Sequence, residues 1–163
     1  MSIVTYNNRS IANISAIPGA AESLTHIKTL TADGSGTSLT FVNGTSDVVL
    51  DSTYPIYLFK FIDIHPETND VQLKVNFRDG GSSYDATKTT VAVRSYHKED
   101  GSASGLTYVD GNDLAQSTAG QQIGQSGNDN DQCVAGMLHL FNPSSTTFVK
   151  HFLCETNNIH ADN

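Results

Sequence analysis

The residues of this chain that could do chemistry are two cysteines, six histidines and several aspartates in polar, glycine-rich stretches. The histidines show neither His-x-His nor His-x-x-x-His spacing, and the cysteines do not form a Cys-x-x-Cys pair, so a transition-metal site is not indicated. We expect the histidines to be structural. Two polar stretches offer oxygen ligands of the kind that Ca²⁺ prefers. The candidate ligands are Asp110, Asn112, Asp113, Asp129 and Asp131.

Neither polar stretch matches an EF-hand loop. Position 12 counted from Asp110 is Gln121, where such a loop needs a bidentate glutamate. Because Asp, Asn and Gly also dominate ordinary turns, the alternative is that these residues only form loops, and the sequence favours that alternative.

Motifs for covalent or nucleotide chemistry are missing from the sequence. The stretch Gly101-Ser102-Ala103-Ser104-Gly105 has alanine where a nucleophile elbow needs serine. Neither a Walker loop nor a strand followed by Gly-x-Gly-x-x-Gly is present, and the few glutamates do not suggest the carboxylate pair of a glycosidase. We therefore expect no catalytic residue and no cofactor.

The length of the chain limits the number of domains, and its charge limits the partners that it can bind. The 163 residues carry 9 basic and 17 acidic side chains, a formal net charge of -8. We expect one domain over 1–163, with 1–23 as a possible N-terminal arm. Nucleic acid is an unfavourable partner because phosphate binding needs clustered Lys and Arg. The N-terminus does not resemble a signal peptide, and no stretch is long and apolar enough for a membrane span.

The hydrophobic pattern has a period of two, which predicts strands. It is clearest over 71–77, while 56–64 is apolar on both faces, and the polar residues 66–70 between them predict an antiparallel hairpin. Further strands are expected at 24–30, 38–42, 87–96 and 106–109. The predicted fold is an all-β antiparallel β-sandwich, jelly-roll or Greek-key like, with about eight strands and little or no helix. The predicted core comprises Leu58, Phe59, Phe61, Leu73, Val75, Phe77, Leu138, Leu140 and Val149.

Residues 110–131 are polar and predict a long loop. About twenty such residues cannot offset a backbone ordering cost of ~1 to 2 kcal/mol each within one domain. If this segment is ordered, we expect it to contact a neighbouring copy of the chain.

The sequence of the last expected hairpin predicts that the two cysteines lie on neighbouring strands. A four-residue loop over 142–145 would place Phe141 opposite Thr146 and Cys133 opposite Cys154. Cross-strand Cα atoms ~4.5 to 5.5 Å apart could be bridged by a disulfide. The alternative is that the two cysteines are small buried apolar residues.

Four segments resemble virion-associated structural proteins of marine tailed phages, particularly those that infect cyanobacteria. They are 1–10 (MSIVTYNNRS), 57–66 (YLFKFIDIHP), 113–116 (DLAQ) and 138–152 (LHLFNPSSTTFVKHF). The resemblance implies a non-enzymatic structural role in the virion, with other copies of the chain and other virion proteins as partners. Similar proteins continue into further strands beyond the position of His160, so either this variant is short or a neighbouring copy supplies those strands.

Two functions are therefore compared. The first is a surface decoration or fibre-like subunit that works through symmetric contacts with itself and the particle. The alternative is a receptor- or carbohydrate-binding module of a tail fibre, with host surface glycans as partners. Its stacking platforms would be Tyr84, Tyr96 and Tyr108, although the chain contains no Trp. An enzyme is the least favoured of the three classes.

Overall fold

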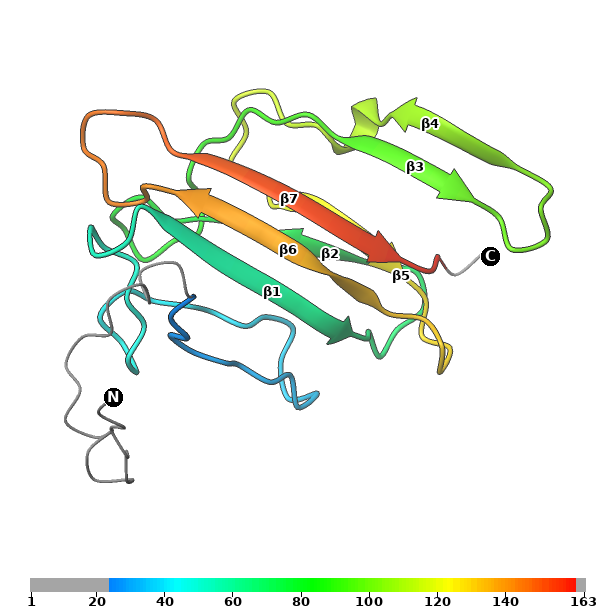
Figure 1. Cartoon of the computed structure of the whole chain (residues 1–163), viewed down its shortest axis with the longest axis horizontal. Coiled ribbons are helices and arrows are strands. Elements are labelled where there is room, and N and C mark those ends of the chain that lie inside the picture. Colours follow the sequence, from blue (N-terminus) through cyan, green and yellow to red (C-terminus); the bar gives the residue numbers. More distant parts are fainter. Residues whose placement is uncertain (1–23, 161–163) are drawn as a thin grey trace, which may run out of the picture.

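The computed structural model describes residues 24–160, which contain seven β-strands, one short 3₁₀ helix and no α-helix. All strand pairings are antiparallel, so the prediction of an all-β antiparallel fold is confirmed (Figure 1). The predicted N-terminal arm, 1–23, lies outside the described residues. Within the described part, no helix is long and apolar enough to cross a membrane. The elements are β1 (Ile56–Ile64), β2 (Val71–Val75), β3 (Val93–His97), β4 (Ser104–Tyr108), η2 (Asp110–Asn112), β5 (Gln121–Ser126), β6 (Val134–Phe141) and β7 (His151–Asn158).

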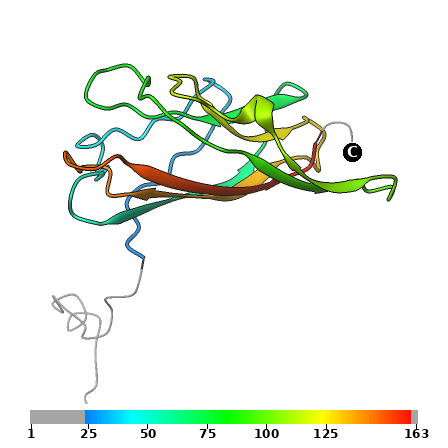
Figure 2. The same ribbon diagram turned by 90° about the horizontal axis from the view of Figure 1, so that it is seen from above.

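The strands form three sheets, in the orders β1-β6-β7, β2-β5 and β3-β4. Figure 2 shows β6 and β7 in one layer and the chain that holds β2 and β5 in a second layer. Side chains of β7 connect the layers, since Asn158 Nδ2 donates to the Gln125 carbonyl at 2.5 Å and the Thr156 hydroxyl donates to the Ile123 carbonyl. A Cβ on Gly124 would lie 2.8 Å from Val134 Cγ1, so the absence of a side chain there allows the layers to meet.

The core lies on the inner face of the three-stranded sheet. Tyr57, Leu138 and Leu140 are 3%, 1% and 8% exposed, and the Tyr57 hydroxyl donates to the Asp51 carbonyl at 3.0 Å, so the buried phenol has a partner. Of the predicted core residues, Leu138 and Leu140 are buried and six others are half-buried. The prediction that Val149 is a core residue is wrong, because Val149 lies in the loop before β7 and is 77% exposed.

The predicted hairpin between 56–64 and 71–77 is wrong, although both strands exist. β1 pairs with β6, and β2 pairs with β5 in another sheet. The β1 ladder is irregular between Phe61 and Ile64, where Asp63 has a φ of 49°, and Asp70 just before β2 has a φ of 59°. The connection therefore carries the chain from one sheet to the other rather than folding it back on itself.

The predicted register of the last hairpin is also wrong. Phe141 lies opposite His151 rather than Thr146, so nine residues, 142–150, form the connection. Within it the Ser145 side chain accepts the Phe148 backbone N–H at 3.0 Å, which holds a local turn instead of a strand. The shift is five residues, an odd number, so each β7 side chain points to the sheet face opposite to the predicted one.

This register separates the two cysteines. Cys154 lies opposite Leu138, whereas Cys133 directly precedes β6, whose first residue, Val134, lies opposite Asn158. Since Asn158 is four strand residues beyond Cys154, the two cysteines are more than about 13 Å apart along the sheet. The predicted proximity of the two cysteines is therefore wrong. Both thiols are free and half-buried, as in the alternative without a disulfide.

The predicted long loop over 110–131 contains η2 and the strand β5. Gln121 and Ser126, which begin and end β5, are 4% and 1% exposed. The Gln121 side chain bonds the carbonyls of Asn112 and Gln122 at 2.9 and 2.8 Å. Because the segment is held by its own domain, its order gives no argument for a neighbouring copy. The expected strands at 24–30 and 38–42 form no paired strand.

Candidate functional site

The predicted cation ligands lie in two separate places. Asp110 and Asn112 belong to η2, which follows β4, while Asp129 and Asp131 lie in the loop between β5 and β6. The Asp113 carboxylate accepts a hydrogen bond from the Tyr108 hydroxyl, which raises the pKa of Tyr108. Over residues 24–160 no group of three or more His, Cys, Asp or Glu side chains is arranged to hold a metal ion. The structure thus brings these residues into no common cation site.

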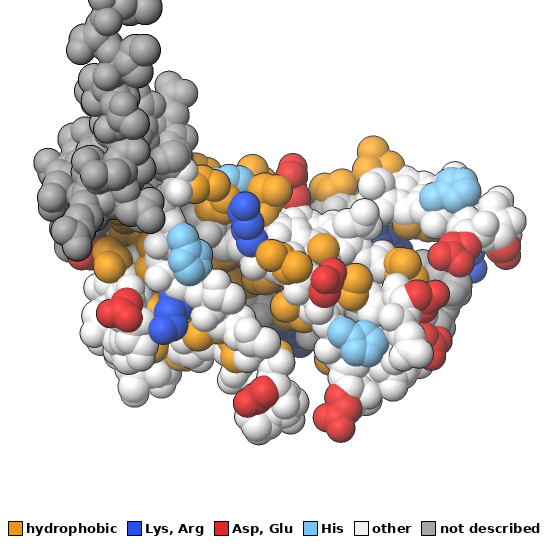
Figure 3. Space-filling view, turned by 60° about the horizontal axis from the view of Figure 1, so that its bottom comes forward, with side chains coloured by type: hydrophobic (Ala, Val, Ile, Leu, Met, Phe, Trp, Pro, Cys, Tyr) orange, Lys and Arg blue, Asp and Glu red, His pale blue; other side chains and the backbone are white. Residues whose placement is uncertain are grey.

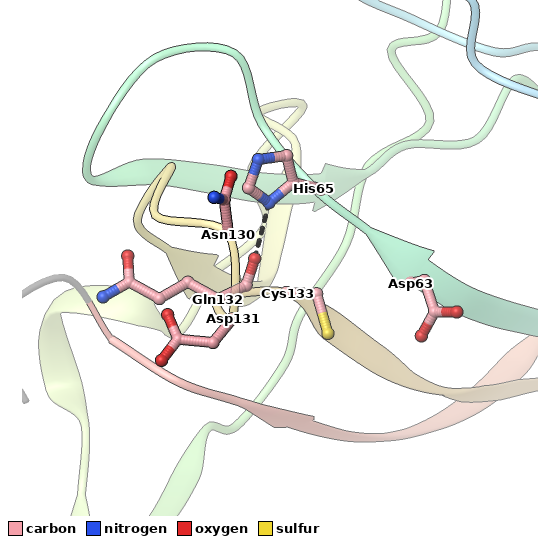
Figure 4. A pocket seen from close by; sticks show the side chains of 6 residues that line it. All are labelled: Asp63, His65, Asn130, Asp131, Gln132 and Cys133. Atoms are coloured by element: carbon pink, nitrogen blue, oxygen red, sulfur yellow. Dashed lines mark hydrogen bonds between the residues drawn. The ribbon is translucent and has the colours of Figure 1, made fainter.

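A polar hollow of about 370 Å³ lies where β1 and β6 meet the loop before β6 (Figure 4). The His65 ring Nδ1 bonds the Gln132 carbonyl at 2.6 Å rather than the Cys133 thiol, and the Asp63 and Asp131 carboxylates point away from each other. A nucleophile needs a base within hydrogen-bond reach, and this arrangement does not supply one. The lining residues are Asp63, His65, Asn130, Asp131, Gln132 and Cys133.

Lys88 is the buried charged residue that the sequence did not single out, and it is 6% exposed. Its Nζ donates to Asn76 Oδ1 at 2.5 Å and to the Ala86 carbonyl at 2.7 Å. Burial lowers the pKa of Lys88, and the nearby Asp85 opposes that effect. Because both bonds are made within the fold, Lys88 joins the segment before β3 to the end of β2.

Exposed apolar side chains are the most prominent feature of the surface. One set lies on the outer face of β1, β6 and β7, where Ile62 is 70% and Leu153 is 56% exposed. Charged side chains interrupt that face, because Lys60, Met137 and Glu155 form one cross-strand row. Figure 3 shows hydrophobic side chains spread among charged ones over the lower side of the molecule.

The second set lies on the hairpin formed by β3 and β4. Figure 1 shows this hairpin beyond β7, with its turn projecting past the end of the three-stranded sheet. Both strands are exposed along almost their whole length, and Gly105 alone is half-buried. Such exposure on both faces is unusual for a two-stranded sheet, which needs further packing to be stable.

The two faces of this hairpin differ. On one, the Arg94 guanidinium lies 5.2 Å from the centre of the Tyr96 ring, and that ring lies over Gly105. On the other, Val93 pairs with Tyr108 and Leu106 pairs with Ser95. The large apolar side chains on that second side, including Val91 two residues before β3, we name the apolar hairpin face. Its members are Val91, Val93, Leu106 and Tyr108, which are 69%, 65%, 77% and 54% exposed.

The three tyrosines that the sequence suggested as stacking platforms have different surroundings. An arginine covers the rings of Tyr84 and Tyr96, with Arg78 lying 5.7 Å from the Tyr84 ring centre. Among residues 24–160, no arginine lies over the Tyr108 ring, which belongs to the apolar hairpin face. The sequence suggested Tyr108 as a platform, but it gave no signal that Val91, Val93 and Leu106 are uncovered beside it.

Comparison with known proteins adds no assignment, because no family model, curated protein or solved structure matches this sequence. The exposed surface of the hairpin and the resemblance of the four sequence segments are therefore the indications of function that this chain offers.

Proposed function

We propose that this chain is a non-enzymatic structural protein of a tailed-phage virion, a surface decoration or fibre-like subunit that associates with copies of itself and with other virion proteins. One observation carries the self-association. Among the described residues, five large apolar side chains form the buried core, whereas fifteen large hydrophobic side chains are exposed. Single exposed apolar residues are common, but neighbouring ones on the same face indicate an interaction surface.

The polar side chains of the described residues support a catalytic function less than the exposed apolar side chains support self-association. The Nδ1 atom of His65 and the Nζ atom of Lys88 are bonded to groups of the fold. The virion context comes from the resemblance of residues 1–10, 57–66, 113–116 and 138–152, and it makes a protein that works through repeated contacts the natural choice.

A carbohydrate-binding module is the second candidate, and one observation favours it. The Tyr108 ring is 54% exposed, and its hydroxyl donates to Asp113 next to η2. An exposed aromatic ring beside carboxylate and amide groups suits a sugar, which stacks on the ring and bonds the polar groups.

Sedimentation velocity of the purified chain over a wide concentration range tests the proposal, with a glycan array as the parallel measurement. We expect concentration-dependent self-association and no glycan binding that Tyr108→Ala abolishes. A chain that stays monomeric and binds a glycan through Tyr108 would replace the structural proposal with the carbohydrate-binding one. Labelling of intact phage particles with an antibody to the chain tests the virion location, and absence of label would reject it.

A further inference from the structure

We infer that the apolar hairpin face docks against the same face of a second copy of this chain, in a two-fold contact that stacks one hairpin on the other. This inference rests on the proposed self-association and names the surface that carries it. The four residues concerned are Val91, Val93, Leu106 and Tyr108.

The hairpin of β3 and β4 has little to stabilise it within one copy of the chain. β3 and β4 form five cross-strand pairs and belong to no larger sheet. The base is held by the Val109 N–H, which donates to the Ala92 carbonyl at 2.9 Å, and the turn by the Lys98 N–H, which donates to the Ala103 carbonyl at 2.8 Å. Two strands alone are marginally stable in water, so a cover over one face would stabilise the hairpin.

Only one of the two faces of the β3–β4 hairpin is open to a partner. Arg94, Tyr96 and Gly105 already cover one face of the hairpin with contacts of their own. The opposite face exposes more than half of each large apolar side chain. A partner would therefore remove apolar surface from water on one side only, which gives the contact a direction.

The exposed area of the apolar hairpin face is comparable to the apolar area of a dimer interface. At exposures between 54% and 77%, the four side chains offer roughly 450 Å² of surface per copy, most of it apolar. A standard interface buries ~800 Å² per partner, and in homodimers ~65% of it is apolar, which amounts to ~500 Å². The apolar hairpin face thus supplies about the apolar area that one side of a stable dimer needs.

Charge limits where two identical copies of this chain can meet. The formal net charge of -8 makes contacts between identical copies unfavourable over most of the surface. A two-fold contact also places like residues near each other, so it requires a face without like charges. Between Val93 and Tyr108 at the base and Ser95 and Leu106 beside them, this side of the hairpin has no Asp, Glu, Lys or Arg; His97 lies on the same side toward the turn, and Asp113 accepts the Tyr108 hydroxyl at the edge. The outer face of the three-stranded sheet instead carries Lys60 and Glu155 within one cross-strand row.

The test compares sedimentation of the wild-type chain with two charge variants that are matched in exposure. Leu106→Glu lies on the apolar hairpin face and Val149→Glu lies in the loop before β7, and both native side chains are 77% exposed. Since a two-fold contact contains the change twice, we expect Leu106→Glu to raise the dissociation constant at least ~100-fold, while Val149→Glu changes it by less than ~3-fold. Far-UV circular dichroism checks that both variants keep the wild-type sheet content.

Hydrogen exchange on the wild-type chain gives a second measurement that needs no variant. We expect amide protection over 93–97 and 104–108 to increase with protein concentration. A self-associating wild type whose dissociation constant is unaffected by Leu106→Glu, or whose hairpin protection does not depend on concentration, would overturn this inference and leave the proposed self-association in place. A wild type that is monomeric at every concentration would overturn both.

Discussion

Truncation of Leu138 to alanine tests the core and the register of the three-stranded sheet together. Leu138 is 1% exposed and lies in the central strand β6, with Phe59 opposite in β1 and Cys154 opposite in β7. Buried Leu→Ala changes cost about 2.7 to 5 kcal/mol, and the cost rises with the cavity that remains. Because Phe59 and Cys154 are only half-buried and can move toward the gap, we expect about 3 kcal/mol here.

Urea unfolding followed by far-UV circular dichroism measures this loss of stability. The matched control is Leu153→Ala on β7, where the side chain is 56% exposed on the outer face, and we expect it to cost less than about 1 kcal/mol. The slope of unfolding free energy against urea should be the same for both variants, so that the midpoints compare stability directly. Equal losses for Leu138→Ala and Leu153→Ala would refute this arrangement of inner and outer faces.

Three further predictions follow from single contacts. Gly136→Ala should destabilise the fold by about 1 to 3 kcal/mol in urea unfolding, because its Cβ would collide with the Glu155 carbonyl of β7. Burial, and then the charge of Glu155, raise the pKa of Cys154 to about 11. The neutral thiol therefore stabilises the fold below about pH 9, and this contribution is lost as the pH rises toward 11. In unfolding measured against pH, Cys154→Ala should show a smaller loss of stability over that range than the wild type. Asn76→Ala should cost about 2 kcal/mol in thermal or urea unfolding, because it removes an acceptor of the buried Lys88 ammonium.

The sequence located the two most apolar strands well, one with clear alternation and one that is apolar on both faces. The expected strand over 56–64 has the bounds of β1, and the expected strand over 71–77 begins where β2 begins. Alternation is a local property, so it locates a strand but does not name the partner strand, and β1 and β2 were assigned to each other incorrectly. β5 (Gln121–Ser126) contains one large apolar residue, Ile123, and pairs with β2, which lies about fifty residues earlier in the chain, so no local pattern shows it.

The error in the last hairpin has a different physical cause. Residues 146–150 are rich in β-branched and aromatic side chains, as strands are, but Pro143 and the turn around Ser145 extend the connection to nine residues. An odd shift in register exchanges the two faces of a strand, so one wrong loop length misplaced Val149 and paired Cys133 with Cys154. Register depends on which side chains the core accepts, and that is decided by the opposite layer rather than by the hairpin itself.

The exposed hairpin shows why the interaction surface could not be predicted from the sequence. Val91 and Val93, just before and at the start of β3, and Leu106 and Tyr108 on β4 have the alternation of an ordinary half-buried pair. That alternation predicted strands at 87–96 and 106–109. In an ordinary pair the same chain covers the apolar side, yet here each of these side chains stays more than half exposed. The pattern is that of a strand pair with one covered face, while the described residues of a single copy supply no cover, so the face is best explained as one that becomes buried when two copies meet.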